Sequence, residues 1–176
     1  MNLQQLCAAS HVTVYFDALN TWLYVDWEGD LTLPAVQQAC LEMAHCFTTH
    51  AHSRVLCNNA NLTSVDWNVA PWVVQHFLPY LRLAGIEQMA WVHAPGERGR
   101  DVAREAIRCL PATLSVALFS EVEQAVAWLQ QTRPSYQSGS TTLPHALPSN
   151  SQLIKLVQRF EQELREVQAL VGPPLA

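Results

Sequence analysis

The sequence predicts an α/β protein with a small mixed, mostly parallel sheet of about five strands flanked by helices. Short runs of β-branched and aromatic residues alternate with segments whose apolar residues recur every three or four positions. Of the 176 residues, 49% are apolar, which is enough for one sizeable core. The first two strands follow each other closely and should form an antiparallel hairpin, whereas helices separate the later strands, which should run parallel.

The N-terminal half contains the hairpin, a helix and a short strand. Residues 12–18 and 23–27 are the strands of the hairpin. Thr32 is placed to cap a helix that has Pro34 in its first turn. The apolar residues of this helix recur at helical spacing: Val36, Ala39, Cys40, Met43 and Phe47. Residues 55–57 then form a short, fully apolar strand.

The most strongly periodic segment of the chain spans residues 69–84. Its apolar and aromatic residues recur in steps of three and four, so one wide face of a helix should be buried. Gly85 is placed to end this helix, and Pro79 should kink it. The next predicted elements are a strand (89–93), a short helix (101–110) and a strand (114–119).

After the last strand the chain changes character. Ser120 and Glu123 form a capping-box pattern, which predicts a helix through Leu129. Residues 132–150 are rich in proline, serine and threonine and are typical of a linker between a domain at 1–131 and a last helix at 151–171. The apolar residues of that helix follow a heptad pattern and are candidates for oligomerisation: Leu153, Val157, Phe160, Leu164 and Val167.

The net charge of −5 lies entirely at the N-terminal end. Residues 1–53 contain five acidic residues and no lysine or arginine. Such a surface disfavours nucleic acid and anionic membranes. No apolar run approaches the ~20 residues of a membrane helix, and the N-terminus does not resemble a signal peptide. Five scattered cysteines without a C-x-x-C pair suit reduced thiols. We therefore expect a cytoplasmic protein without nucleic-acid binding or membrane insertion.

The main candidate site is the polar segment that follows strand 55–57. It contains Asn58, Asn59, Asn61, Thr63, Ser64 and Asp66. A partner- or ligand-binding loop is one interpretation, because parallel sheets place binding groups at this edge. Turn and cap chemistry alone is a second, and phosphorylation of Thr63 or Ser64 near a helix start is a third. Catalysis would need a base beside the hydroxyl and none is nearby, so no catalytic residue is predicted.

Two further groups of side chains are candidates for binding. A cluster at the end of the first helix contains His45, Cys46, His50 and His52. It lacks a second ligand pair at a recognised spacing, so we predict no metal site and no cofactor. Trp72, His76 and Trp91 are the expected lining of a pocket, should the protein bind a small apolar ligand.

The helix after strand 89–93 carries a stripe of arginines. Arg100, Arg104 and Arg108 are four residues apart, with acidic neighbours between them. Because oppositely charged side chains three or four positions apart neutralise each other, a solvated helix face is expected here. A cation-rich docking patch is the alternative interpretation.

Several short segments resemble those of a known protein family. These segments are Trp27-Glu28-Gly29, the strand RVLCNNANL, the block Trp72…Phe77-Leu78-Pro79…Ala84-Gly85, the strand AWVHA and the segment Phe119…Ala125-Val126-Ala127-Trp128-Leu129. Together with the order of elements, they resemble bacterial STAS-like proteins, the SpoIIAA-like relatives of anti-sigma-factor antagonists, over residues 10–130. The resemblance implies a mixed sheet without catalytic machinery, action through a bound partner, and a phosphorylated serine in the segment 58–66. The antagonists carry an Asp-Ser-Ser-Gly-like motif there, whereas no glycine follows Ser64 in this chain.

Two functions from different classes stay open. The first is a non-catalytic STAS-like interaction or regulatory module that associates with itself. The alternative is a binder of a small apolar ligand, or a minor enzyme, with a pocket near residues 58–66 and His76. The apolar seam of helix 151–171 must be buried, either on its own domain or against another chain. We predict a homodimer in which this helix supplies part of the interface, and another protein as a further partner.

Overall fold

A single sheet organises the computed structural model, which describes residues 1–49, 52–108, 114–132 and 150–171. The strands are β1 (Leu3–Ala9), β2 (Val12–Asp17), β3 (Trp22–Leu31), β4 (Arg54–Val65), β5 (Gln88–Val92) and β6 (Ser115–Phe119). The helices are α1 (Leu33–Thr49), α2 (Val69–Trp72), the π-helical η1 (Val73–Phe77), α3 (Leu78–Leu83), α4 (Gly96–Arg108), α5 (Val122–Gln131) and α6 (Asn150–Val171).

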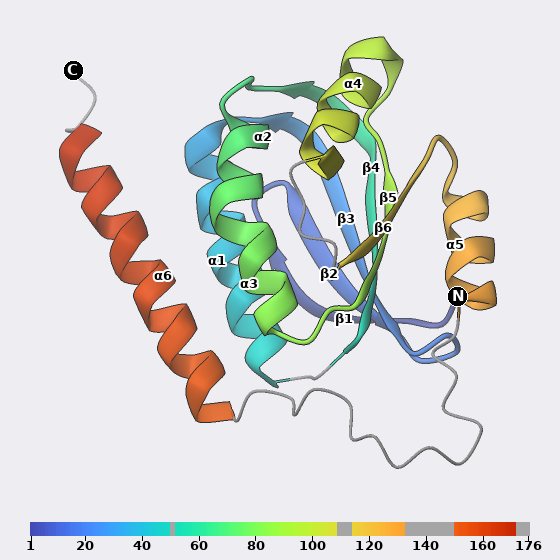
Figure 1. Cartoon of the computed structure of the whole chain (residues 1–176), viewed down its shortest axis with the longest axis horizontal. Helices are drawn as coiled ribbons and strands as arrows, with labels where there is room; N and C mark the ends of the chain where they lie inside the picture. Colours follow the sequence, from blue (N-terminus) through green and yellow to red (C-terminus); the bar gives the residue numbers. More distant parts are fainter. Residues whose placement is uncertain (50–51, 109–113, 133–149, 172–176) are drawn as a thin grey trace.

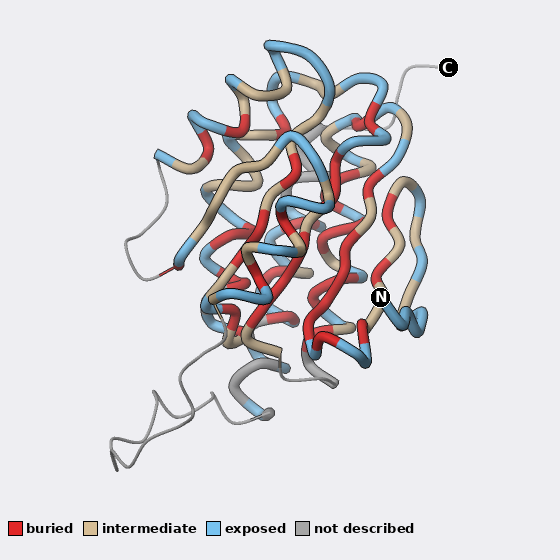
Figure 2. The backbone as a smooth tube through the Cα atoms, turned by 90° about the vertical axis from the view of Figure 1, so that its right-hand side faces the viewer, coloured by how far each residue is buried: buried red, intermediate tan, exposed pale blue. Residues whose placement is uncertain are grey.

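The six described strands lie in the order β1-β2-β3-β4-β5-β6. β1, β2 and β3 pair antiparallel, and β3 to β6 pair parallel. Helices lie on both faces, with α1 and the α2–η1–α3 helix on one side and α5 on the other (Figure 1). The predicted mixed α/β class is confirmed, with one strand more than expected. Figure 2 shows that burial is concentrated in the central strands between these layers.

β1 and β4 differ from the sequence-based prediction. β1 was not predicted, because it is an edge strand whose residues are mostly exposed and lack an apolar alternation. β4 does not end at residue 57 but continues through the polar segment to Val65. It can do so because β3 is also long and pairs with it as far as Leu31. The predicted loop at 58–66 is therefore wrong: most of it is strand, and only Asp66 follows the strand's end.

The predicted helix over 69–84 is continuous but irregular. Pro79 lies in the first turn of α3 and has no N–H to donate to the preceding turn. The turn that would accept this hydrogen bond is the π-helical η1, directly before α3. Gly85 follows α3 with φ of 94°, which is the left-handed conformation expected of a helix-ending glycine.

One predicted helix cap forms and one does not. The Oγ1 of Thr32 accepts a hydrogen bond from the N–H of Ala35 at 3.4 Å, as expected for the cap of α1. The capping box at Ser120 is absent, because α5 begins one residue later than the pattern predicts. Glu121 takes the cap position, and it makes no side-chain cap hydrogen bond.

α6 lies outside α1 and α3 (Figure 1) and packs its apolar seam onto them. Val157, Phe160 and Leu164 are 2%, 7% and 5% exposed. The Phe160 ring lies 5.8 Å from Trp72 and 6.3 Å from Phe77 and Tyr80, measured between ring centroids. The side chains of Leu153 and Val167 fall outside the described residues. The described side chains of the seam are thus buried within one chain, and the homodimer stays a prediction.

The packing of α6 predicts a large loss of stability on truncating Phe160. Phe160→Ala should lower the free energy of unfolding by about 3 kcal/mol, because a buried aromatic ring is removed from a cluster that cannot collapse around the gap. Ile154→Ala is the matched control, since Ile154 is 44% exposed on the same helix. Urea unfolding should show a loss for Phe160→Ala that is several times larger than for Ile154→Ala. Equal effects of the two substitutions would contradict the packing.

Candidate functional site

The polar side chains of β4 lie on both faces of the sheet, because successive side chains of a strand point to opposite faces. Asn58 lies on the α5 side, where its Nδ2 donates to Tyr24 Oη at 3.0 Å and to Asp26 Oδ1 at 2.8 Å. Burial raises the pKa of Asp26 despite the hydrogen bonds from Asn58 and Asn61, and the charge of Glu28 acts in the same direction as burial. These side chains therefore join β3 to β4.

Thr63 and Ser64 both donate their hydroxyls to one carboxylate. Ser64 Oγ lies 2.8 Å from Asp30 Oδ1, and Thr63 Oγ1 donates to the same oxygen. Consecutive residues of a regular strand face opposite sides, but the register of β4 slips here, since Gly29 pairs with Leu62 and Asp30 with Ser64. The two hydrogen bonds lower the pKa of Asp30, so this carboxylate is ionised at neutral pH.

Asp66 starts the helix that follows β4. Its Oδ1 accepts a hydrogen bond from the N–H of Asn68 at 3.1 Å, and its main-chain carbonyl accepts one from Val69 at 3.0 Å. This is the turn chemistry that the sequence offered as one interpretation. Trp67, between these residues, is 72% exposed.

An apolar cavity of about 290 Å³ lies between the sheet and the helices. Its floor comes from β3, β4 and β5, which supply Val25, Trp27, Val55, Cys57, Asn59, Met89 and Trp91. The helices supply the walls, with Val36, Cys40, Met43 and Phe47 from α1, Val73, Phe77, Leu78 and Leu81 from η1 and α3, and Arg98, Gly99, Val102 and Ala103 from α4. The lining also includes Thr63, Ser64 and Ala94, at or just after the carboxyl ends of β4 and β5, where open α/β sheets bind ligands.

Few polar groups reach this cavity. Asn59 is 8% exposed, and its Nδ2 donates to the carbonyl of Val92 at 2.9 Å and to Cys57 Sγ at 3.6 Å. These contacts leave Asn59 Oδ1 without a partner in the described part of the chain. Thr63 and Ser64 also line the cavity, beside the N-terminal turn of α4.

The charge of the cavity lining comes from Arg98. Burial raises the pKa of Cys57 to about 12, and it raises the pKa of Cys40 above its ordinary value, so both thiols are neutral at physiological pH. No other lysine, arginine or carboxylate lies among the described lining residues. Arg98 is exposed and makes no ion pair with a described residue. An unpaired cation at the edge of an apolar cavity favours a ligand with an anionic group.

Trp91 is the only residue of the predicted pocket trio that lines the cavity among the described residues. Val69, Val73 and Phe77 take the cavity-facing stripe of the helix. Trp72 and His76 lie on a neighbouring stripe, where their rings stack with centroids 5.5 Å apart. Trp72 contacts Phe160 of α6, and His76 is exposed, so the predicted pocket around Trp72 and His76 is wrong.

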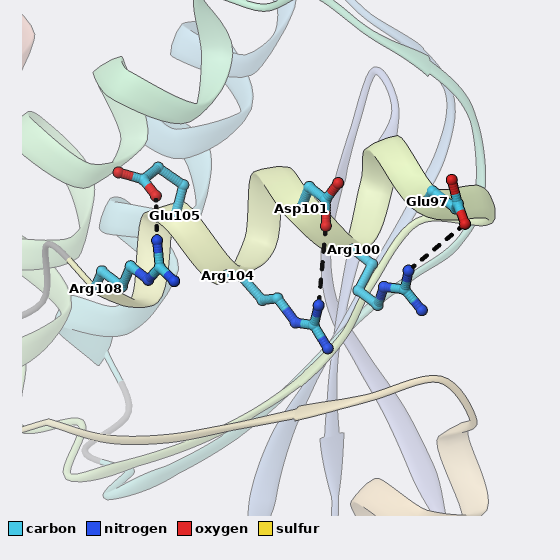
Figure 3. Close-up of polar contacts among 6 residues, drawn as sticks. All are labelled: Glu97, Arg100, Asp101, Arg104, Glu105 and Arg108. Atoms are coloured by element: carbon cyan, nitrogen blue, oxygen red, sulfur yellow. Dashed lines mark hydrogen bonds and ion pairs between the residues drawn. The ribbon is translucent and has the colours of Figure 1, made fainter.

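α4 forms the outer wall of the cavity, and its close packing requires glycine. A Cβ on Gly99 would lie 2.3 Å from the carbonyl oxygen of Ala94, so any side chain there would push α4 away from β5. The exposed face of α4 carries the ion pairs Glu97–Arg100 (3.9 Å), Asp101–Arg104 (3.9 Å) and Glu105–Arg108 (3.3 Å), as Figure 3 shows. The prediction of a neutralised arginine stripe is confirmed; exposed pairs of this kind add at most about 1 kcal/mol each.

Sequence patterns did not identify Asp30 as part of this region. Asp30 reaches Thr63 and Ser64 only because β3 and β4 pair along their full length. The close packing of α4 has a signal in the sequence, because glycines at positions 96 and 99 follow a predicted parallel strand. Glycines at such positions indicate that a helix lies close to its neighbours.

The structure describes only part of the sequence cluster His45, Cys46, His50 and His52. His45 and Cys46 lie on α1, whereas His50 lies outside the described residues. In the described ranges no three His, Cys, Asp or Glu side chains lie close enough to hold a metal ion. Within the same ranges, no helix has the length and apolar character needed to cross a membrane.

Comparisons with known proteins identify the family. A family model described as SpoIIAA-like matches residues 22–130. An uncharacterised protein with a SpoIIAA-like fold from Shewanella loihica PV-4 is 15% identical, with a TM-score of 0.48, over 67% of this chain and 91% of that one. The anti-sigma factor antagonist SpoIIAA in its unphosphorylated form is 15% identical, with a TM-score of 0.44, over 75% and 99%. No curated protein matches the chain.

The family model spans more than half of the 176 residues, from β3 to α5. It therefore contains the strands that form the floor of the cavity and the helix that forms its outer wall. The resemblance inferred from the element order and the aromatic, glycine and proline positions is confirmed. The chain belongs to the SpoIIAA-like family.

Proposed function

We propose that this protein is a non-catalytic SpoIIAA-like binding module that holds a small, mostly apolar ligand between its sheet and its helices. The observation that carries the proposal is the cavity of about 290 Å³. Its volume is near the lower end of the roughly 300–1,000 Å³ found for ligand pockets, and its lining is predominantly apolar with a few polar groups, as such pockets require. Membership of the SpoIIAA-like family supports a regulatory or interaction role of the STAS type.

The polar groups define the class of ligand. Arg98 supplies a positive charge, and Asn59 Oδ1 and the hydroxyls of Thr63 and Ser64 supply hydrogen-bonding groups on the β4 side. The remaining lining is aliphatic, aromatic or a neutral thiol. The ligand is therefore an apolar molecule with one anionic group, whose apolar part lies inside and whose charge lies next to α4.

A second candidate function is a protein-interaction module, which the exposed Trp67 favours. Tryptophan is enriched among the residues that dominate protein interfaces, because it buries a large area on binding. Trp67 follows β4 and stands close in sequence to Thr63 and Ser64, whose hydroxyls are exposed. Phosphorylation of either hydroxyl would replace a hydrogen bond to Asp30 by charge repulsion, and this would alter the surface beside Trp67. In this proposal the module is cytoplasmic and also associates with itself.

Binding of an apolar anion tests the first candidate. The fluorescence of 1-anilinonaphthalene-8-sulfonate should rise on binding, and Ala103→Leu should weaken its affinity about tenfold because the larger side chain fills the cavity. Arg98→Gln should weaken it about threefold, since the sulfonate loses its cation. Arg104→Gln is the matched control, because Arg104 lies on the same helix, pairs with Asp101 and does not line the cavity. Unchanged affinity in folded Ala103→Leu would exclude binding at this site.

A charge substitution tests the phosphorylation site. Ser64→Glu should lower the melting temperature by about 2 °C relative to Ser64→Ala, because a second carboxylate faces Asp30. Asp30→Asn should abolish the difference. So should acidification through the pKa of Asp30, which the Thr63 and Ser64 hydroxyls depress, because the repulsion exists only while Asp30 is ionised. A difference that persists with Asp30→Asn would refute the proposed charge switch.

Light scattering tests self-association. The full chain should have the mass of a homodimer, and Phe160→Asp with Leu164→Asp should yield a monomer, because charges on the seam prevent α6 from docking on either chain. Far-UV circular dichroism should confirm that the sheet and the other helices of the double variant remain folded. Identical masses for the two proteins would show that α6 does not make the oligomer.

A further inference from the structure

We propose that Cys7 and Cys46 form a reversible disulfide when the protein meets a low-molecular-weight disulfide such as oxidised glutathione, and that this bond fastens the edge strand β1 to α1. The proposal concerns a modification site that is separate from the cavity. Three observations support it: the register of β1, the place of Cys46 on α1, and the direct contact between the two thiols.

The register of β1 turns Cys7 toward α1. Gln5 pairs with Tyr15 and Cys7 pairs with Val14, so Leu6 is an extra residue that forms a β-bulge. Directly opposed residues of an antiparallel pair share a face of the sheet. Val14 is fully buried in the core cluster that α1 covers, so Cys7 faces the same helix. Without the bulge, Leu6 would take this position.

Cys46 approaches from the last turn of α1. Its neighbours Met43 and Phe47 are buried in the core, whereas Cys46 is only partly buried, at the edge of the stripe that faces the sheet. α1 packs directly against β1. The side chains of Cys7 and Cys46 interact with each other, so the two thiols are neighbours across the contact between α1 and β1.

Both members of this pair are accessible. Cys7 and Cys46 are each partly exposed, so an oxidant can reach them. Cys57 is also partly exposed, but it lies in the floor of the cavity, and Cys40 is 1% exposed. Cys109 lies outside the described residues.

The two thiols influence each other's ionisation. The interaction with Cys46 lowers the pKa of Cys7, although burial and the charge of Glu42 oppose this effect. Because the thiolate is the nucleophile in disulfide exchange and the two sulfur atoms are neighbours, either cysteine can attack first and the other can then resolve the mixed disulfide.

The exchange takes place in two balanced steps. The thiolate of one of the two cysteines attacks one sulfur of oxidised glutathione, which forms a mixed disulfide and releases one glutathione thiolate. The other cysteine then loses its proton and attacks the Sγ of the first, which forms the protein disulfide and releases the second glutathione. Two protein thiols are oxidised and one glutathione disulfide is reduced to two thiols. Excess reduced glutathione reverses both steps.

The bond would stabilise the least supported strand of the sheet. β1 is at the edge and pairs only with β2 in the described sheet, and most of its residues are exposed. Edge strands of this kind fray and can pair with other chains. A crosslink between positions 7 and 46 closes a long loop of the unfolded chain, which typically adds stability.

Peptide mapping of the full chain tests the linkage. The protein is treated with oxidised glutathione, blocked with iodoacetamide and digested with trypsin and Glu-C without reduction. Cleavage after Glu and Arg separates all five cysteines, into peptides 1–28, 29–42, 43–54, 55–82 and 109–121. Mass spectrometry should find 1–28 joined to 43–54. A different pairing, glutathione adducts alone, or unmodified Cys7 and Cys46 would each overturn the proposal.

Stability and hydrogen exchange test the consequence. The oxidised protein should melt about 5 °C or more above the reduced protein, and dithiothreitol should abolish the difference. Amide exchange in β1 should slow on oxidation. Cys7→Ser and Cys46→Ser should each remove both effects, and the matched control Cys40→Ala should retain them. A disulfide that forms without changing exchange in β1 would refute the fastening of this strand.

Discussion

The buried guanidinium of Arg54 connects three parts of the fold at the start of β4. Arg54 is 5% exposed, and its Nη1 donates to the carbonyl of Leu129 at 3.0 Å, at the C-terminal end of α5. Its Nη2 donates to the carbonyl of Asn20 at 2.6 Å and to Thr21 Oγ1 at 2.9 Å, in the turn between β2 and β3. The group also lies 5.3 Å from the ring centroid of Trp22. A buried charge requires such hydrogen bonds, and a helix C-terminus favours a cation.

The position of Arg54 determines which side chains of β4 face the cavity. Because side chains alternate, placing Arg54 on the α5 side puts Leu56 and Asn58 on that side, and puts Val55, Cys57 and Asn59 on the side of α1. A slip of one residue would exchange the two sets and bring the arginine into the apolar core. The contacts of one arginine with the hairpin turn and with α5 therefore support the register on which the cavity depends.

Elements that are determined by neighbouring residues can be predicted from the sequence. Elements that depend on contacts with residues far away in the sequence cannot. The hairpin, the cap at Thr32 and the glycine at position 85 were predictable because neighbouring residues determine them. The extension of β4 was not, because its polar side chains are satisfied by residues more than thirty positions away, as in the bonds from Asn58 to Asp26 and from Ser64 to Asp30. The cavity could not be predicted either, since its lining comes from eight elements that are spread along the sequence.

α1 is the element through which these features are physically linked. One stripe of this 17-residue helix, which includes Cys40 and Met43, lines the cavity. A second side packs against α6, where Leu41 and His45 lie beside Leu164. Its last turn holds Cys46 against β1. Because packed interiors transmit displacement, a shift of α1 that accommodates a ligand must also alter the surface beneath α6 and the distance to Cys7. The proposed ligand binding and thiol oxidation would therefore act on the same helix on which α6 docks, and any coupling between them would be reciprocal.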